Sequence, residues 1–294
     1  MLIDLQKKEL CALAHLNVPY RDAKAWLRCP QHNWVYDKLV LAQRCGTPCG
    51  PLGVKPKCFP VILKPIVNLG GMGRDAERID SAEQYAAAMN SGAAGRFWMP
   101  FFTGEHISLD LVLCRGTVQW HCAWRGYPTE PWSPAFDRWE TLPHYLLPPL
   151  RLLEHLRDYT GILNVELIGG QLVEAHLRMG DLHYFASVKL FRAIGKALEG
   201  QAMHWPVPEL AAVPVFQRAD QVCGCMEELD VEELCDCRLL YVDALVGNNP
   251  TGFVRRCLLV GSLSACLEAR QRILAALERK AECQARSGFA CSRP

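Results

Sequence analysis

Residues 163–178, LNVELIGGQLVEAHLR, constrain the fold more strongly than any other segment of the chain. Two runs of alternating apolar and polar residues flank Gly169 and Gly170, and paired glycines favour the tight turn of a β-hairpin. The sequence therefore predicts antiparallel strands over 163–168 and 171–176. Because side chains alternate along a strand, five polar residues are expected on one face of this hairpin. They are Asn164, Glu166, Glu174, His176 and Arg178.

Glu166 and Glu174 are expected to be close cross-strand neighbours, because their positions are one residue away from symmetry about the turn. Two carboxylates on one face repel each other unless a positive group lies between them. Mg²⁺ prefers one or two carboxylates together with phosphate oxygens. The pair is therefore a candidate magnesium site, and the alternative interpretation is a solvated polar face of the sheet.

A short apolar run, residues 59–64 (FPVILK), predicts a buried strand that ends at Lys64. The glycine-rich sequence Gly70-Gly71-Met72-Gly73 follows it closely. Glycines let the backbone approach a phosphate and present N–H groups, and a lysine supplies the compensating charge. This pattern indicates a phosphate-binding loop, although an ordinary tight loop after a strand would look the same.

Residues 97–110, FWMPFFTGEHISLD, place an aromatic stretch directly before polar groups. A flat apolar slot beside a hydrogen-bonding side chain suits a nucleobase and its ribose. Core packing is the alternative interpretation for any single aromatic residue of this segment.

The rest of the chain predicts a mixed α+β class with antiparallel hairpins and flanking helices. A second hairpin is expected over 107–114 and 118–124, and Ser81 with Gln84 forms a capping-box pattern that opens a helix to about Met89. The other expected segments are helices at 34–44, 150–159, 185–198 and 264–282, a long loop at 127–149, a proline-rich bend at 205–214, and strands at 238–246 and 253–260.

The composition excludes several classes of protein. The chain has 294 residues, with 32 Lys and Arg against 31 Asp and Glu, which argues against a nucleic-acid binder that relies on bulk charge. No apolar run reaches the ~20 residues that span a bilayer, and the N-terminus lacks the order of a signal peptide. Fifteen cysteines in such a chain favour reduced, packed thiols in a cytoplasmic protein. The alternative is a zinc site formed by Cys223, Cys225, Cys235 and Cys237.

Five motifs in one order resemble the ATP-grasp family over residues 34–182. They are Asp37-Lys38, Lys64-Pro65, Gly70-Gly71-Met72-Gly73, Gly104-Glu105-His106-Ile107-Ser108-Leu109-Asp110 and Glu174-Ala175-His176-Leu177-Arg178. The C-terminal segment FVRRCLLVGSLSACLEARQRI is similar to the closing segment of biotin-carboxylase-like members, and the resemblance as a whole is closest to biotin-carboxylase-like and carbamoyl-phosphate-synthase-like members. The resemblance implies an α+β fold in which two lobes with antiparallel sheets grip a nucleotide.

The resemblance also implies a role for each matching residue. ATP and Mg²⁺ are the expected cofactors. Arg178 would stabilise the transferring phosphoryl group or the acyl-phosphate, and Lys64 would act with it in catalysis. The expected nucleotide contacts are Lys38 and Lys64 to the phosphates, Gly70, Gly71, Met72 and Gly73 as the lid, the backbone near Met99 and Phe102 to adenine, and Glu105 with His106 to the ribose. The expected metal ligands are Glu166, Glu174 and His176.

The family resemblance implies a domain organisation with a short front. A helical N-terminal segment is expected at 1–33 and the ATP-grasp core at 34–199, with a small lobe at about 58–98 and a large lobe at about 99–199. A closing segment at 200–286 packs on the large lobe, and 287–294 form a tail. Most relatives carry a whole N-terminal domain before the core, so a homo-oligomer or a partner chain is the candidate source of that domain here.

Two residues depart from the family pattern. His176 stands where the family places a metal-binding Asn, and an imidazole is softer than an amide oxygen, which makes Mn²⁺ an alternative to Mg²⁺. Met99 stands where an acidic residue is usual.

The implied function is an ATP-dependent ligase that activates a small-molecule carboxylate as an acyl-phosphate for attack by an amine or thiol. The alternatives are a catalytically silent nucleotide-binding module with a regulatory or scaffolding role and, third, a kinase that leaves the phosphate on its product.

Overall fold

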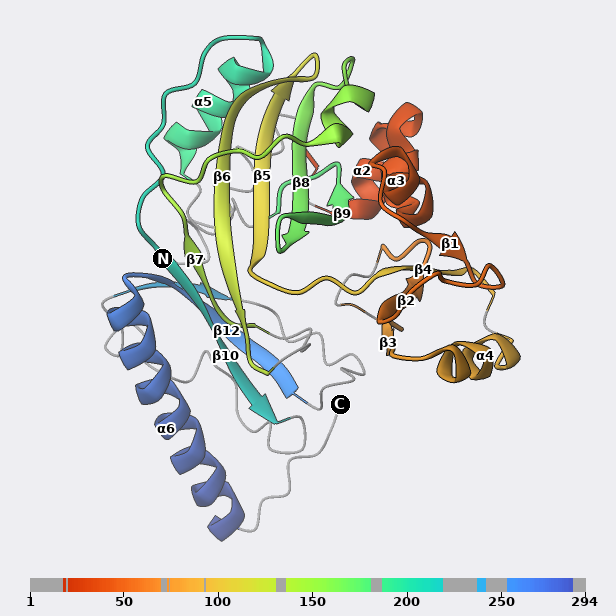
Figure 1. Ribbon diagram of the computed structural model, residues 1–294. Coiled ribbons are helices and arrows are strands. Elements are labelled where there is room, and N and C mark those ends of the chain that lie inside the picture. The colour runs from red at the N-terminus through yellow and green to blue at the C-terminus, as the bar shows by residue number, and fades with distance from the viewer. Residues whose placement is uncertain are drawn as a thin grey trace. The chain divides into compact units, whose positions relative to one another are not determined.

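The computed structural model describes residues 18–19, 21–69, 73, 75–92, 94–130, 136–180, 187–218, 237–241 and 253–287 (Figure 1). The chain divides into two compact units, one holding Ile3–Arg125 with Leu142–Val207 and the other holding Gly126–Thr141 with Pro208–Pro294. No helix within the described ranges has the length and apolar character needed to cross a membrane. Nine cysteines of the described residues are free thiols.

A four-stranded sheet in the first unit carries the predicted strand that ends near Lys64. Its order is β1 (Gly50–Pro51), β4 (Arg96–Pro100), β2 (Val61–Pro65) and β3 (Glu77–Ile79). The helix α4 (Ala82–Asn90) follows β3, and the Ser81 hydroxyl accepts a hydrogen bond from the Gln84 amide at 3.3 Å, as the capping pattern predicts. The Gln84 side chain accepts in turn from the backbone N–H of Asp80 at 2.7 Å.

A second set of strands in this unit contains both predicted hairpins. β6 (Thr117–Pro128) lies next to β5 (His106–Cys114), which pairs antiparallel with β8 (Gly161–Ile168), and β8 pairs with β9 (Gln171–His176). Glu166 lies directly opposite Glu174 in the register. The predicted α+β class is thus confirmed, as is the expectation that Glu166 and Glu174 are close cross-strand neighbours.

A β-bulge explains how these two glutamates come to face each other although they are not symmetric about the turn. The register shifts between Glu166 and Leu167, and Val173 is the extra residue of β9 with no partner in the ladder. From Glu174 onward the pairing is offset by one residue, so Asn164 lies opposite His176. The bulge therefore sets which side chains share the polar face.

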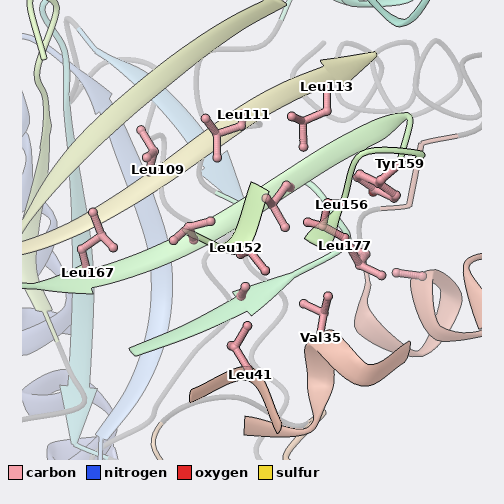
Figure 2. Close-up of a cluster of buried hydrophobic side chains, with 14 of the residues drawn as sticks. Val35, Leu41, Leu109, Leu111, Leu113, Leu152, Leu156, Tyr159, Leu167 and Leu177 are labelled. Atoms are coloured by element: carbon pink, nitrogen blue, oxygen red, sulfur yellow. The ribbon is translucent and has the colours of Figure 1, made fainter. Parts of the chain in front are cut away.

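The other face of this sheet forms the main hydrophobic core. Figure 2 shows Val35 and Leu41 on the helical side and the leucines of β5 and β8 on the sheet side. The helical side comprises α2 (Asp22–Arg28), the 3-10 helix η1 (Pro30–Tyr36) and α3 (Lys38–Arg44), which lie beside β8 and β9 in Figure 1. Burial of one leucine contributes about 2 kcal/mol, so this layer fixes the N-terminal helices on the sheet. A further helix, α5 (Val188–Leu198), packs on β5.

The helix predicted over 34–44 begins later than its apolar spacing indicates. Residues 30–36 form η1, and α3 starts only at Lys38 because the Asp37 carboxylate accepts a hydrogen bond from the Val40 amide at 2.9 Å. An aspartate at this position stabilises a helix start by about 1 kcal/mol. The interruption matters for the site, because it places Lys38 at the first residue of α3.

Three further expectations are corrected. Part of the predicted loop 127–149 is a strand, β7 (Phe136–Thr141), whose Phe136 and Trp139 rings lie 4.3 Å apart. The helix predicted over 150–159 is only the 3-10 helix η2 (Arg151–His155), and the predicted bend at 205–214 gives way to β10 (Ala211–Arg218). The proline and tryptophan residues of these segments favour a loop interpretation. The strands form there because packing outweighs the local conformational preference of the residues.

The second unit has its own core. The strand order is β11 (Arg238–Tyr241), β12 (Phe253–Gly261), β10 and β7, and the helix α6 (Leu263–Ser287) packs on β10. Cys257, Cys266 and Ile273 are fully buried in this core. Residues 126–141 belong to this unit, although the sequence assigns them to the large lobe at 99–199.

A close contact between two glycines joins the β4–β5 connection to the β8–β9 turn. Gly104 has a φ of +120°, and a Cβ built there would lie 2.9 Å from the Cα of Gly169. Gly169, at a φ of +55°, donates its backbone N–H to the carbonyl of Glu105 at 2.9 Å, and a Cβ there would clash with the Thr103 carbonyl oxygen. The connection that leads to His106 is therefore fixed directly against the hairpin.

We expect Gly169→Ala to destabilise the protein by about 1–3 kcal/mol more than Gly170→Ala, since only the first adds a steric overlap. Gly170 is a matched control because its φ is +76° and nothing lies within 4 Å of its built Cβ. Both variants carry the similar cost of a left-handed backbone, about 1–2 kcal/mol. Urea unfolding measures the difference, and equal losses in the two variants would refute the contact.

Candidate functional site

The polar face of β8 and β9 brings together the three residues predicted as metal ligands. Glu166, Glu174 and His176 each offer an atom within 4.8 Å of the others. His176 is buried, with only 3 % of its surface exposed, and the Glu174 side chain is 17 % exposed. The face is thus too enclosed to be the solvated polar surface that the sequence left as an alternative.

Glu174 is surrounded by cations from three elements. Its Oε2 pairs with the ammonium of Lys38, and its Oε1 lies 3.3 Å from Nε2 of His176. Burial by itself raises the pKa of Glu174, but the hydrogen bond from His176 and the charges of Lys38 and Lys64 hold the pKa well below its usual range. The carboxylate is therefore ionised and available to a cation at neutral pH.

Lys64 reaches the same site from β2. It is 7 % exposed, and its ammonium donates to the carbonyl of Val173 at 3.0 Å. Val173 is the bulge residue, and its carbonyl orients the lysine. Burial lowers the pKa of Lys64 to about 8, with Glu174 opposing the shift. The bulge thus serves both the carboxylate pair and the lysine.

Asp22 is a site residue that sequence reasoning missed. Its Oδ1 accepts hydrogen bonds from Nδ1 of His176 at 3.1 Å and from Nε of Arg178 at 2.9 Å. Burial raises its pKa, but His176 and Arg178 overcome this effect and the net pKa is lowered. The Met179 amide donates to the Pro19 carbonyl at 3.1 Å, which fixes the start of α2 beside the end of β9. An aspartate in a first helical turn reads as an ordinary helix-stabilising charge, so no sequence pattern indicates this role.

Two further contacts hold the end of β9 in place. The hydroxyl of Tyr36 accepts from the Leu177 amide at 3.1 Å, and its ring stands edge-on to His176 with centroids 6.1 Å apart. Burial and the nearby Asp22 charge raise the pKa of Tyr36, so its phenol stays neutral. On the other side, the fully buried Asp110 accepts from the Gly180 amide at 2.7 Å. The strand end that carries Arg178 is therefore held from both sides.

The residues predicted to contact adenine lie in one apolar cluster. Met99 is buried on β4 and packs with Phe97 and Ala42, and Phe102 is half-buried against the same cluster. The Met99 side chain is therefore part of this apolar cluster. Polar contacts to an adenine would then have to come from backbone groups near Met99 and Phe102.

The two residues predicted to hold a ribose, Glu105 and His106, have different partners. His106 faces the metal-ligand pair, with Nε2 lying 3.2 Å from Oε2 of Glu166. Glu105 is 62 % exposed and pairs with Arg125 at 2.8 Å. Arg138 pairs with Asp137 and Glu140 in the second unit.

Part of the predicted glycine lid is described. Gly73 has a φ of +56°, a conformation that glycine adopts without strain. Gly70, Gly71 and Met72 lie outside the described residues, as do Cys223, Cys225 and Cys235 of the candidate zinc site.

The donor set fits a divalent cation that also binds phosphate. Two carboxylates face each other across β8 and β9, which is the ligand type that Mg²⁺ prefers. Lys38, Lys64 and Arg178 add fixed positive charge around them, as a polyphosphate requires.

The free energy of unfolding is expected to fall by about 1–2 kcal/mol between pH 6.5 and 8 through His176 alone. Burial lowers the pKa of His176, but hydrogen bonds to Asp22 and Glu174 raise it overall to about 9, above the unfolded value of 6.5. Because the pKa of His176 is higher in the folded state, its protonation stabilises the fold fully below pH 6.5. This stabilisation is lost as the pH rises to 9. Denaturant unfolding at several pH values measures this slope.

The variant His176→Asn provides the comparison. It removes the titrating group, so its stability should change less than that of the wild type over the same range. The comparison is restricted to pH values up to 8 because of Lys64, whose pKa is lowered to about 8. Above that pH, Lys64 makes the free energy of unfolding rise with pH, which opposes the contribution of His176. Parallel pH profiles for the two proteins would contradict the assignment.

Comparison with known proteins gives structural matches alone. No family model and no curated protein sequence matches the chain. The L-amino acid ligase from Bacillus licheniformis is 13 % identical, with a TM-score of 0.53 over 84 % of this chain and 71 % of that chain. N5-carboxyaminoimidazole synthetase from Staphylococcus aureus, complexed with ADP, is 12 % identical, with a TM-score of 0.56 over 83 % and 71 %. Carboxyaminoimidazole ribonucleotide synthase from Aspergillus clavatus, complexed with ATP, is 13 % identical, with a TM-score of 0.53 over 83 % and 73 %.

These matches extend over most of the chain. At such low identity the likeness concerns the fold. The chain therefore has the ATP-grasp fold, which it shares with ligases.

Proposed function

We propose that this protein is an ATP-dependent ligase that joins a carboxylate to an amine or a thiol. In the first step a carboxylate oxygen attacks the γ-phosphorus of ATP, which gives an acyl-phosphate and ADP. In the second step the nucleophile attacks the acyl carbon and phosphate leaves, while an amine loses its proton as the amide forms. A carboxylate needs this activation because its oxygen is otherwise a poor leaving group.

The observation that carries the proposal is the convergence of separate motifs on one polar sheet face. Lys38 from α3 and Lys64 from β2 both lie close to Glu174 on β9, and Glu166 on β8 faces the same point. Chance packing seldom encloses two lysines and two glutamates that come from four elements. A polyphosphate with its cation explains why these charges are gathered there.

Each charged residue then has a distinct task. Lys38 and Lys64 would bind phosphate oxygens, and the orientation of Lys64 by Val173 reduces the freedom that it loses on binding. Glu166 and Glu174 would hold Mg²⁺, which when bound neutralises charge on the phosphates. Arg178, held by Asp22, would stabilise the charge on the transferring phosphoryl group or the acyl-phosphate.

The apolar cluster on the small sheet suits the adenine base. Phe97 and Met99 are buried there, and Phe102 at its edge is half-buried. Planar bases bind in slots of this kind, with backbone groups as hydrogen-bonding partners. Four of the similar structures are described as complexes with ATP or ADP, which supports a nucleotide as the ligand.

The substrate class is supported by the similar structures. One is named an L-amino acid ligase and others are named carboxyaminoimidazole ribonucleotide synthetases or synthases. We infer a small-molecule carboxylate and a small-molecule nucleophile as substrates of this chain.

A silent nucleotide-binding module is the second candidate function. It is favoured by the direct contact of Lys38 with Glu174, because a lysine tied to a carboxylate has less charge to offer a phosphate. Catalysis requires this contact to open when the nucleotide binds, whereas a module that does not turn over has no such requirement.

An assay of ADP release distinguishes the two functions. With Mg-ATP and mixed pools of carboxylates and amines, we expect ADP and phosphate to form only when both pools are present. Glu174→Gln should lower the rate by about 100-fold or more, since it removes a carboxylate that holds the cation. Mass spectrometry then identifies the product.

Glu154→Gln is the matched control, because Glu154 is an exposed carboxylate away from this face and its loss should leave the rate unchanged. Binding of ATP without ADP release under any condition would favour the silent module. ADP release with a phosphorylated product and no free phosphate would instead identify a kinase.

A further inference from the structure

The third member of the metal-ligand group is an imidazole backed by a buried carboxylate. We propose that Asp22 orients His176 as a metal ligand beside Glu166 and Glu174, and that this site selects Mn²⁺ over Mg²⁺. The proposal rests on the proposed nucleotide-binding function for the place of the metal but concerns which cation binds. Asp22 itself lies outside all five motifs.

The hydrogen bond at Nδ1 defines the orientation of the ring. Asp22 Oδ1 lies 3.1 Å from Nδ1 of His176. A carboxylate only accepts, so Nδ1 carries a proton, and Nε2 is the nitrogen directed toward the two glutamates. The proton that Nε2 donates to Glu174 in the cationic ring is released when Nε2 binds a metal. Metal-binding histidines generally have their other ring nitrogen bound to a carboxylate or carbonyl in this way.

The distances within the group agree with ligands of one ion. Nε2 lies 3.3 Å from Oε1 of Glu174, and all three donor atoms are within 4.8 Å of one another. Adjacent ligands of an octahedral ion with bonds near 2.1 Å are about 3 Å apart, and opposite ones about 4 Å. A small movement of the three side chains would therefore bring their donor atoms to the separations found around one bound ion.

The ring has little freedom to adopt another orientation. Side-chain exposure is 4 % for His176 and 8 % for Asp22. The Tyr36 ring stands edge-on to the imidazole, and Asn164 lies opposite it in the ladder. A fixed nitrogen donor is consequently part of the site and cannot turn toward solvent.

An imidazole nitrogen changes the preference among divalent cations. Mg²⁺ is a hard ion that prefers oxygen and keeps its water, whereas Mn²⁺ accepts nitrogen together with carboxylates. A site of two carboxylates and one imidazole therefore favours Mn²⁺ more than a site with an amide oxygen in the same place.

Asp22 also connects the metal group to the arginine. The same Oδ1 that accepts from His176 accepts from Nε of Arg178 at 2.9 Å. Loss of this carboxylate should therefore loosen the metal ligand and the arginine together. Asp22 is in this sense a positioning residue, because it acts through the two side chains it binds.

The sharpest test uses the wild-type protein with Mn²⁺ alone. Pulsed electron paramagnetic resonance detects the ¹⁴N of a directly bound imidazole as a modulation of the electron spin echo. We expect this nitrogen signal, together with displacement of Mn²⁺ only by a large excess of Mg²⁺. Absence of the nitrogen signal, absence of Mn²⁺ binding, or equal affinity for the two ions would each overturn the proposal.

Variants then assign the signal. His176→Asn should abolish the nitrogen signal and weaken Mn²⁺ binding about tenfold or more, while Mg²⁺ binding changes much less. Asp22→Asn should weaken Mn²⁺ binding by about 10–100-fold. Asp158→Asn is the matched control, since Asp158 is an exposed aspartate 3.7 Å from another buried histidine, His32, and should leave Mn²⁺ binding unchanged.

The result is independent of whether the protein is a ligase. Metal binding is read without ATP, carboxylate or amine, so a missing ligase activity would leave a nitrogen-bound Mn²⁺ intact. Conversely, a ligase that shows no nitrogen signal would retain the proposed function and refute the metal assignment. A retained nitrogen signal in a folded His176→Asn variant would also refute it.

Discussion

A buried carboxylate must be neutralised, and the site depends on how Glu174 meets this requirement. Leaving an ionised carboxylate in a poorly hydrated environment without a partner costs several kcal/mol. Lys38, Lys64 and His176 surround Glu174, and Asp22 balances the charge on the far side of His176. The helices that carry Asp22 and Lys38 must therefore lie on the sheet, and the core beneath them serves this charge arrangement.

Small irregularities in the backbone make that arrangement possible. The bulge at Val173 aligns Glu166 with Glu174 and supplies a carbonyl for Lys64. The contact between Gly104 and Gly169 fixes the connection that leads to His106. Without the bulge, Glu174 would not lie opposite Glu166. A single inserted residue thus has more influence on the site than most of the apolar core.

Much of the site was predictable because its signals are local. Alternation around Gly169 and Gly170 predicted the hairpin and its polar face, and the family resemblance indicated Lys38 and Lys64 in advance. Asp22 was not predictable, since it lies 154 positions from His176 and its partners meet only through tertiary packing. The strand β7 was hidden by a Trp- and Pro-rich segment, and the bulge is visible only in the register.

The proposed function requires one binding site for a nucleotide polyphosphate. This site is formed by Lys38, Lys64, Glu166 and Glu174. A crystal structure of the protein with Mg-ADP tests this claim most directly. We expect the ammonium groups of Lys38 and Lys64 to bind phosphate oxygens, and Glu166 and Glu174 to contact the cation. Nucleotide bound elsewhere, with Lys38 still paired to Glu174, would contradict it.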